Sequence, residues 1–195
     1  MNCESVIVLA SASPRRKELM AKAGYRFEVV PADIDESAYD SQDVEPVEYA
    51  KTLALAKARC VASEFGDNIV VGADTIVDSD GLIIGKPEDP EHAREIIVKL
   101  FSAPHKVITG LAIMRLCDNV EIAASETTIV YPRKMSEEQI ACHIEGGSWR
   151  GKAGAYGIQE TGDEFVERIE GSFSNVMGLP MELLETFIKG ISGGE

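Results

Sequence analysis

Short apolar runs alternate with amphipathic stretches along the chain, and this alternation predicts a mixture of strands and helices. The apolar runs are continuous and rich in β-branched residues, which is typical of buried strands. We expect strands at residues 5–10, 27–30, 69–71, 106–116, 120–132 and 165–169, the fourth and fifth of which form a hairpin. Apolar residues at helical spacing predict helices at residues 14–23, 45–65, 90–101, 136–144 and 179–188.

The stretch from residue 68 to residue 87 is the most informative part of this pattern. Its first apolar run leads through two small residues to Asp74 and Thr75. Asp80-Gly81 then separates two further apolar runs, and this pair tolerates the positive φ of a tight hairpin turn. We therefore expect a buried strand that ends at Asp74 and a hairpin that brings Lys86 back beside it.

The succession of strands and helices contains no internal repeat and no Pro/Ser-rich linker. The chain has 195 residues, of which 45% are hydrophobic, and this is enough for one domain with a sizeable core. We expect a single α/β domain over residues 1–195. Its architecture would be a mixed twisted sheet with flanking helices and two lobes around a central cleft.

The formal net charge of −14 narrows the class of partner. It argues against nucleic acid and against an anionic membrane surface, where a basic face supplies most of the affinity. A small anionic ligand stays compatible, because a local basic cluster or a divalent cation can neutralise phosphate charge. The chain shows no secretory signal pattern and no apolar run near the ~18 residues of a membrane span. We expect a cytoplasmic protein with four reduced, scattered cysteines.

A candidate phosphate site lies at the start of the first helix. Ser13 is a favourable N-cap and Pro14 a favourable first residue, and both follow a predicted strand. Free N–H groups at a helix start form an anion site. Arg15 and Arg16 stand in this first turn, where they oppose the helix dipole unless a bound polyphosphate compensates for them. The alternative is that both arginines are solvated on an exposed face.

Three further segments carry candidate polar groups, each with a plain structural alternative. Glu36 lies in the acidic loop 33–37, which could bind a metal or position a water, or could be a solvated turn. Lys57 lies in an alanine-rich helix, where a snorkelling surface lysine is the competing interpretation. The glycine-rich loop 145–160 suggests close approach to a ligand rather than a flexible loop, and Gln159 offers both a donor and an acceptor for a base edge.

Five motifs together resemble the Maf family. They are LASASPRR at 9–16, VVGADTIV at 70–77, GKP at 85–87, KAGAYGIQ at 152–159 and GSFSNVMGLP at 171–180, in the family's order. The resemblance implies a nucleoside triphosphate pyrophosphatase, which cleaves between the α- and β-phosphates and releases a nucleoside monophosphate and pyrophosphate. It also implies a fold similar to that of inosine triphosphatase, a divalent cation (Mg²⁺ or Mn²⁺) and a homodimer.

The resemblance assigns roles to individual residues. Asp74 matches the family's proton acceptor, and Arg15, Thr75 and Gln159 match positions that govern substrate choice. The AGAYGIQ version resembles the subgroup that acts on dTTP and UTP. Glu160-Thr161 and the segment 146–151 depart from that subgroup, which leaves the base preference open. The other polar residues that match the family's cleft are Ser11, Arg16, Glu36, Lys57 and Lys86.

Hydrolysis of a phosphoanhydride needs charge neutralisation, an oriented water and a base. We expect Asp74 and Glu36 to hold the metal or to take the proton of the water, with Lys86 acting beside them. The cations that would clamp the triphosphate are Arg15, Arg16, Lys57 and Lys86.

A second hypothesis belongs to another class of protein. The chain could be a nucleotide-binding regulator of cell division that works without significant turnover. A pure binder does not require the set of Glu36, Asp74 and Lys86, so the presence of that set favours the enzyme.

Overall fold

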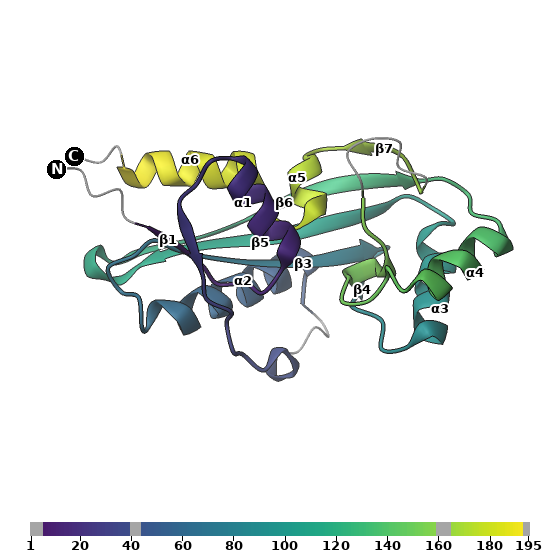
Figure 1. Cartoon of the computed structure of the whole chain (residues 1–195), viewed down its shortest axis with the longest axis horizontal. Helices are drawn as coiled ribbons and strands as arrows, with labels where there is room; N and C mark the ends of the chain where they lie inside the picture. The colour runs from purple at the N-terminus through teal and green to yellow at the C-terminus, as the bar shows by residue number, and fades with distance from the viewer. Residues whose placement is uncertain (1–5, 40–43, 159–164, 193–195) are drawn as a thin grey trace.

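A seven-stranded mixed sheet forms the centre of the computed structural model, which describes residues 6–39, 44–158 and 165–192 (Figure 1). Its order is β2-β1-β3-β5-β6-β7, and β4 pairs with β3. β1 runs parallel to β2 and β3, whereas the remaining pairs are antiparallel. The strands are β1 (Ile7–Leu9), β2 (Phe27–Val29), β3 (Val70–Ser79), β4 (Leu82–Ile84), β5 (His105–Arg115), β6 (Val120–Pro132) and β7 (Val166–Glu170).

Helices cover both faces of the sheet (Figure 1). α1 and α6 lie on one face of the sheet, and α2 lies on the other. α3 and α4 lie together near β4, at the end of the sheet away from the N-terminus. The α-helices are α1 (Pro14–Lys22), α2 (Pro46–Ala62), α3 (Pro90–Leu100), α4 (Glu137–Gly146), α5 (Phe173–Met177) and α6 (Met181–Ser192). The short 3-10 helices are η1 (Glu36–Ala38), η2 (Leu116–Asp118) and η3 (Ala153–Ala155). This architecture confirms the predicted mixed α/β class.

The prediction that a strand ends at Asp74 is wrong. β3 continues through Asp74 to Ser79, and it pairs with β5 over nine residues, with Asp74 opposite Gly110. The small residues before Asp74 do not break the strand, because a long antiparallel partner satisfies the backbone on that side. Asp74 therefore projects from the middle of a long paired strand. The hairpin turn forms where it was predicted, at Asp80 (φ 54°) and Gly81 (φ 84°).

The segment 171–178, which the sequence presents as turn-rich, contains the short helix α5. The Ser172 hydroxyl accepts a bond from the Asn175 N–H at 3.2 Å and caps the helix. Gly178 ends it with a φ of 108°, in the left-handed region that favours glycine. A five-residue helix has too few turns to show a periodic apolar face, so only its cap and its glycine were visible in the sequence.

Two glycines let α2 lie directly on the sheet. A Cβ at Gly72 would overlap the carbonyl oxygen of Ala54, and a Cβ at Gly110 would overlap that of Ala50. The close approach places Lys57 of α2 over the strand that carries Asp74. The positions of these glycines therefore determine how the functional side chains meet.

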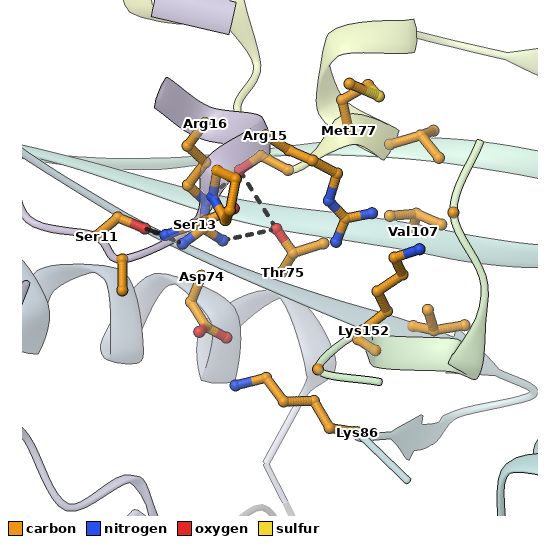
Figure 2. A pocket seen from close by; sticks show the side chains of 18 of the residues that line it. Ser11, Ser13, Arg15, Arg16, Asp74, Thr75, Lys86, Val107, Lys152 and Met177 are labelled. Carbon is orange, nitrogen blue, oxygen red and sulfur yellow. Dashed lines mark hydrogen bonds between the residues drawn. The ribbon is translucent and has the colours of Figure 1, made fainter. Parts of the chain in front are cut away.

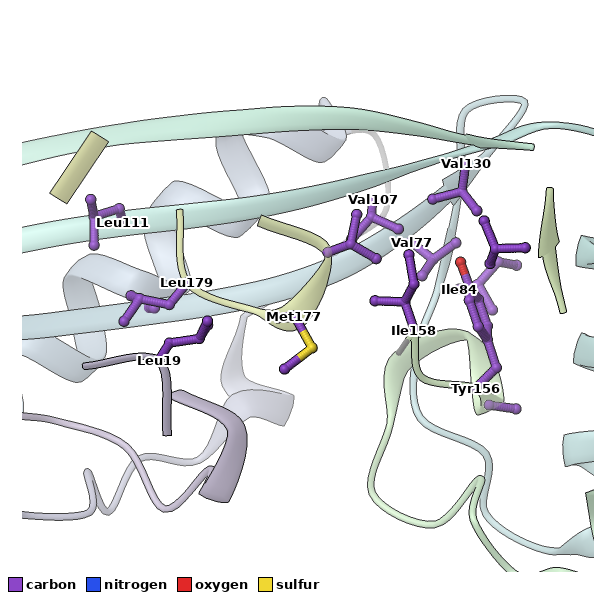
Figure 3. Close-up of a cluster of buried hydrophobic side chains, with 14 of the residues drawn as sticks. Leu19, Val77, Ile84, Val107, Leu111, Val130, Tyr156, Ile158, Met177 and Leu179 are labelled. Atoms are coloured by element: carbon purple, nitrogen blue, oxygen red, sulfur yellow. The ribbon is translucent and has the colours of Figure 1, made fainter. Parts of the chain in front are cut away.

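Alternation along the strands builds one core on each face of the sheet. Val8, Val70 and Ala112 pack against the alanines of α2. On the other face, a larger cluster runs from α1 and α6 to the loop before β7 (Figure 3). Figure 3 shows Leu19, Leu111 and Leu179 at one end of this cluster and Val77, Tyr156 and Ile158 at the other, with Met177 between them.

Two sequence expectations concern the chain's environment. Among the described residues, no helix is both long and apolar enough to cross a membrane. Cys60, Cys117 and Cys142 are free thiols, as expected, and Cys3 lies outside the described residues.

Candidate active site

A cavity of about 640 Å³ opens between the start of α1 and the loop that contains η3. Its floor is the middle of β3, and its remaining walls come from α2, α5 and the segment after β4. Figure 2 shows side chains of α1, β3, α5 and the segment after β4 directed into the same space. The residues predicted for the site that line it are Ser11, Arg15, Arg16, Glu36, Lys57, Asp74, Thr75 and Lys86.

Lys57 joins two carboxylates at one end of this cavity. Its Nζ lies 2.5 Å from Asp74 Oδ1 and 2.8 Å from Glu36 Oε1. Lys57 and Asp74 are 9% and 7% exposed, so the interpretation of Lys57 as a snorkelling surface lysine is wrong. Lys86 is an exposed member of the group, with Nζ 3.7 Å from Glu36 Oε2. The two acidic residues that the sequence proposed as partners do converge on one point.

The charges around Glu36 favour its ionised form. Partial burial would raise the pKa of this carboxyl, but the hydrogen bond and charge of Lys57, helped by Lys86, outweigh burial and leave the pKa below its ordinary value. Glu36 therefore stays a carboxylate through the neutral range. This end of the cavity holds two anionic groups whose position depends on a single buried ammonium.

Arg16 connects three elements rather than pointing freely into the cavity. Its Nε donates to the Gly178 carbonyl at 2.7 Å, and its two terminal nitrogens donate to Ser11 Oγ and Thr75 Oγ1, both at 3.1 Å. Burial lowers the pKa of Arg16, and Asp74 opposes that effect. Within the described part of the chain, three of the five N–H groups of the guanidinium donate to protein acceptors, and the other two can donate to a ligand. The predicted role of Arg16 as a phosphate clamp stays a prediction, beside an evident role in positioning.

Thr75 continues this network into the core. Its hydroxyl lies 3.0 Å from Thr109 Oγ1, and Thr109 donates to the Asn175 carbonyl at 3.0 Å. The Asn175 side chain is fully buried and donates in turn to Val107 O and Thr128 Oγ1. α5 is thus fixed to the sheet behind the cavity, and Thr75 is held in one orientation.

The N-terminus of α1 faces the cavity without a side-chain cap. Ser13 occupies the N-cap position as predicted, but its hydroxyl makes no capping bond. The Ser13 N–H donates instead to Ser11 Oγ at 3.2 Å. Among the described residues, the first-turn N–H groups of Arg15 and Arg16 have no protein acceptor, so they remain available to an anion.

Lys152 is a cavity residue that the sequence reasoning did not single out. Its Nζ and Arg15 Nη1 both approach Gly157, where an added Cβ would lie 3.3 Å and 3.2 Å from them. Burial lowers the pKa of Lys152 and of Arg15, and the charge of Arg15 lowers that of Lys152 further. The available signal was the motif KAGAYGIQ itself, which places a lysine directly before a tight glycine turn.

Two buried histidines anchor the loop around η3. His105 Nδ1 lies 3.2 Å from the Leu100 carbonyl, so it carries the proton, and Nε2 accepts from the Tyr156 hydroxyl at 2.6 Å. His143 Nε2 likewise donates to the Ala155 carbonyl at 2.9 Å. Ala155 has a φ of 60°, a conformation that is costly outside glycine and that these contacts help to hold. His105 therefore holds Tyr156 and the end of α3 in place.

A family described as "Maf-like protein" matches residues 6–191. The chain belongs to the Maf family. Among curated relatives, a dTTP/UTP pyrophosphatase of Citrifermentans bemidjiense is 45% identical over 177 residues, covering 91% of each chain. A second, from Ruminiclostridium cellulolyticum, is 40% identical over 183 residues, covering 94% of each chain. The solved structure of the Staphylococcus aureus Ham1 protein aligns with a TM-score of 0.53 and 13% identity, covering 94% of this chain and 98% of that one, and shows the likeness of fold alone.

The Maf motifs meet at this cavity, although they are far apart in the sequence. LASASPRR supplies Ser11, Arg15 and Arg16, and VVGADTIV supplies Asp74 and Thr75. Lys86 comes from GKP, and the motif GSFSNVMGLP forms the wall beside Arg16. Gln159 lies outside the described residues, so its predicted contact with a base stays a prediction.

The donor set of this Maf site fits a divalent cation bound together with phosphate. Among the described residues, no three His, Cys, Asp or Glu side chains gather into a complete protein cage. Asp74 and Glu36 do converge within 2.8 Å of the same ammonium. One or two carboxylates, completed by phosphate oxygens and waters, is the usual protein contribution to a Mg²⁺ site of this kind.

Proposed function

We propose that this Maf protein hydrolyses the α–β phosphoanhydride of dTTP and UTP, giving the nucleoside monophosphate and pyrophosphate. The main support is the ion-paired group of Asp74, Glu36 and Lys57 at one end of a cavity that is also lined by Arg15, Arg16 and Lys86. The relatives that cover most of this chain bear the name dTTP/UTP pyrophosphatase. Together these findings support a triphosphate whose scissile bond lies beside the carboxylates.

In this proposal Asp74 takes the proton of the attacking water. Two observations support this role: Asp74 projects from a long paired strand, and Lys57 fixes one of its oxygens. Glu36 orients the water from the opposite side of the ammonium, and Lys86 balances charge on the phosphates. General-base assistance of this kind is worth about 10²–10⁴ in rate.

The triphosphate would bind at the start of α1. The uncapped N–H groups of the first turn and the two remaining N–H groups of Arg16 are donors for its oxygens. Asp74 and Glu36 would hold Mg²⁺ or Mn²⁺ together with the phosphates. When bound, such an ion neutralises phosphate charge and lowers the pKa of a coordinated water.

We also propose that the protein is a homodimer, as the family resemblance suggests, and that it is located in the cytoplasm, as the sequence suggests. A protein that acts on free nucleoside triphosphates needs access to the pool in which they are made. Neither nucleic acid nor membrane is required for the reaction, and the net charge of −14 suits neither partner.

The test is pyrophosphate release from a panel of triphosphates with Mg²⁺ or Mn²⁺. The panel contains dTTP, UTP, CTP, the purine nucleotides and modified pyrimidine nucleotides. We expect dTTP and UTP to be turned over fastest and each to give one pyrophosphate per monophosphate. If the protein binds nucleotides but releases pyrophosphate from none of them, the proposed activity is wrong and the nucleotide-binding regulator becomes the better hypothesis.

A further inference from the structure

The cavity has a second cationic group that the proposed chemistry leaves unused. Figure 2 shows Lys86 directed toward Asp74, whereas Lys152 and Arg15 point toward one another beside Val107. The two ends of the cavity therefore carry different chemistry. One end holds carboxylates bridged by lysine, and the other holds two cations with no carboxylate among the lining residues that the structure describes.

Lys152 and Arg15 are held together although they repel one another. Both tips lie over the backbone of Gly157, where a Cβ would be 3.3 Å from the lysine Nζ and 3.2 Å from the arginine Nη1. Neither side chain forms an ion pair within residues 6–39, 44–158 and 165–192. The two partly buried cations repel one another, and a ligand with acceptor atoms would relieve that repulsion.

The surroundings of this pair suit a flat ring better than a phosphate. The apolar residues lining the cavity near it are Val77, Val107, Tyr156, Ile158 and Met177. Such side chains cannot replace the water around a phosphate, but they can pack on both faces of a base. A nucleotide with its scissile bond beside Asp74 would extend its base toward this apolar part of the cavity.

The hydrogen-bonding chemistry of the pair selects among bases. Lysine and arginine are donors without any acceptor atom. Uracil and thymine present two carbonyl oxygens, O2 and O4, on their pairing edge. Cytosine replaces O4 by an amino group, which is a donor and would face a cation. Resting on the proposed function, we infer that Lys152 is a specificity-determining residue that, together with Arg15, reads the O4 carbonyl of uracil or thymine and excludes cytosine.

The competing role for Lys152 is to bind a phosphate of the same nucleotide. The two roles give opposite results for UMP and CMP, which carry the same phosphate and differ in the base. A phosphate ligand contributes equally to both nucleotides. If Lys152 instead donates to O4, it contributes to the affinity for UMP alone. A hydrogen bond from a charged donor of this kind corresponds to about 10- to 100-fold in affinity.

The experiment is calorimetric binding of UMP and CMP to the full chain, wild type and Lys152→Met. We expect the wild type to prefer UMP and the variant to lose about 10- to 100-fold in UMP affinity, with CMP affinity little changed. Lys152→Arg keeps a donor and should keep the preference. Lys189→Met removes an exposed charge on α6 and serves as the matched control. An equal loss for UMP and CMP in Lys152→Met overturns the inference in favour of phosphate binding.

A second variant tests the position of the cations instead of their charge. Gly157→Ala retains both charges and places a methyl group against both tips, so it should weaken UMP more than CMP. Unchanged selectivity in both Gly157→Ala and Lys152→Met overturns the inference. Because the experiment measures binding, it can separate the two proposals. Selective UMP binding without pyrophosphate release from any triphosphate would support the role of Lys152 in base selection and would contradict the proposed pyrophosphatase activity.

Discussion

Lys57 Nζ lies 2.5 Å from Asp74 Oδ1, with both side chains buried between α2 and β3. The same ammonium reaches Glu36 at 2.8 Å. One lysine thus holds together two carboxylates that would otherwise repel, and it does so at the site where a phosphoanhydride would be attacked. If Asp74 acts as proposed, this one contact serves both the stability of the fold and the reaction.

Removing the ammonium should destabilise the fold. Lys57→Met leaves the buried Asp74 without its partner, and loss of one member of a buried ion pair costs about 3–5 kcal/mol of unfolding free energy. Urea denaturation at neutral pH measures the effect. The double variant Lys57→Met/Asp74→Asn removes the orphaned charge and should recover part of the loss. A double variant that is less stable than Lys57→Met would contradict this account of the pair.

Arg16→Lys keeps the charge but should lose the connection between α1, β3 and α5. A lysine has one nitrogen and cannot span the acceptors at Gly178, Ser11 and Thr75. We expect an unfolding free energy about 1–3 kcal/mol lower and a smaller kcat/KM for UTP. If Arg16→Lys keeps the wild-type unfolding free energy and kcat/KM, the positive charge at position 16 is sufficient and the three hydrogen bonds are not needed. Lys17→Arg, one position further along the same helix, is the matched surface control.

Much of this site could be predicted because its residues stand in contiguous motifs. The helix start at Pro14, the carboxylate Asp74 and Lys86 were all visible in the sequence. The burial of Lys57 could not be predicted, because it depends on how closely α2 approaches the sheet. That distance is set by Gly72 of β3 and Gly110 of β5, which are distant from Lys57 in the sequence. Lys152 was missed for a similar reason, since its partner Arg15 is 137 positions away by residue number (152 − 15).

Gly110→Ala tests the close packing of α2 on the sheet. The added Cβ would meet the backbone of Ala50, which cannot swing aside as a side-chain tip can. Overpacking of this kind costs about 1–3 kcal/mol, and the displaced helix would carry Lys57 away from Asp74. Gly146→Ala is the control, because its Cβ would meet nothing within 4 Å. Thermal unfolding of the two variants gives the comparison, and equal melting temperatures would refute the packing argument.

The sheet itself illustrates which parts of a fold depend on distant pairing. The hairpin of β5 and β6 was predicted, since its two strands adjoin in sequence. The continuation of β3 past Asp74 was not, because residues 74–78 become strand through their pairing with β5. The local pattern therefore identified Asp74 as a candidate but placed it at the end of a strand instead of in the middle of one.

His105 should make the protein sensitive to mild acid. Burial lowers the pKa of His105 below its ordinary value of 6.5, so the unfolded chain binds a proton that the folded protein resists. The stabilisation is fully present above pH 6.5 and is lost as the pH falls through the window between 6.5 and the lowered folded pKa. Denaturation at several pH values should show a shallower loss of unfolding free energy below pH 6.5 in His105→Gln than in the wild type. Parallel curves for the two proteins would contradict this assignment.

Asp74 is proposed to act in the hydrolysis of the α–β bond of UTP or dTTP. The most direct measurement is product analysis of UTP turnover by wild type and Asp74→Asn, with UMP, UDP, phosphate and pyrophosphate quantified together. We expect UMP and pyrophosphate in equal amounts from the wild type, and a rate about 10²–10⁴ lower for Asp74→Asn with UMP binding retained. Release of UDP and phosphate by the wild type, or near-normal pyrophosphate release by Asp74→Asn, would contradict this role of Asp74.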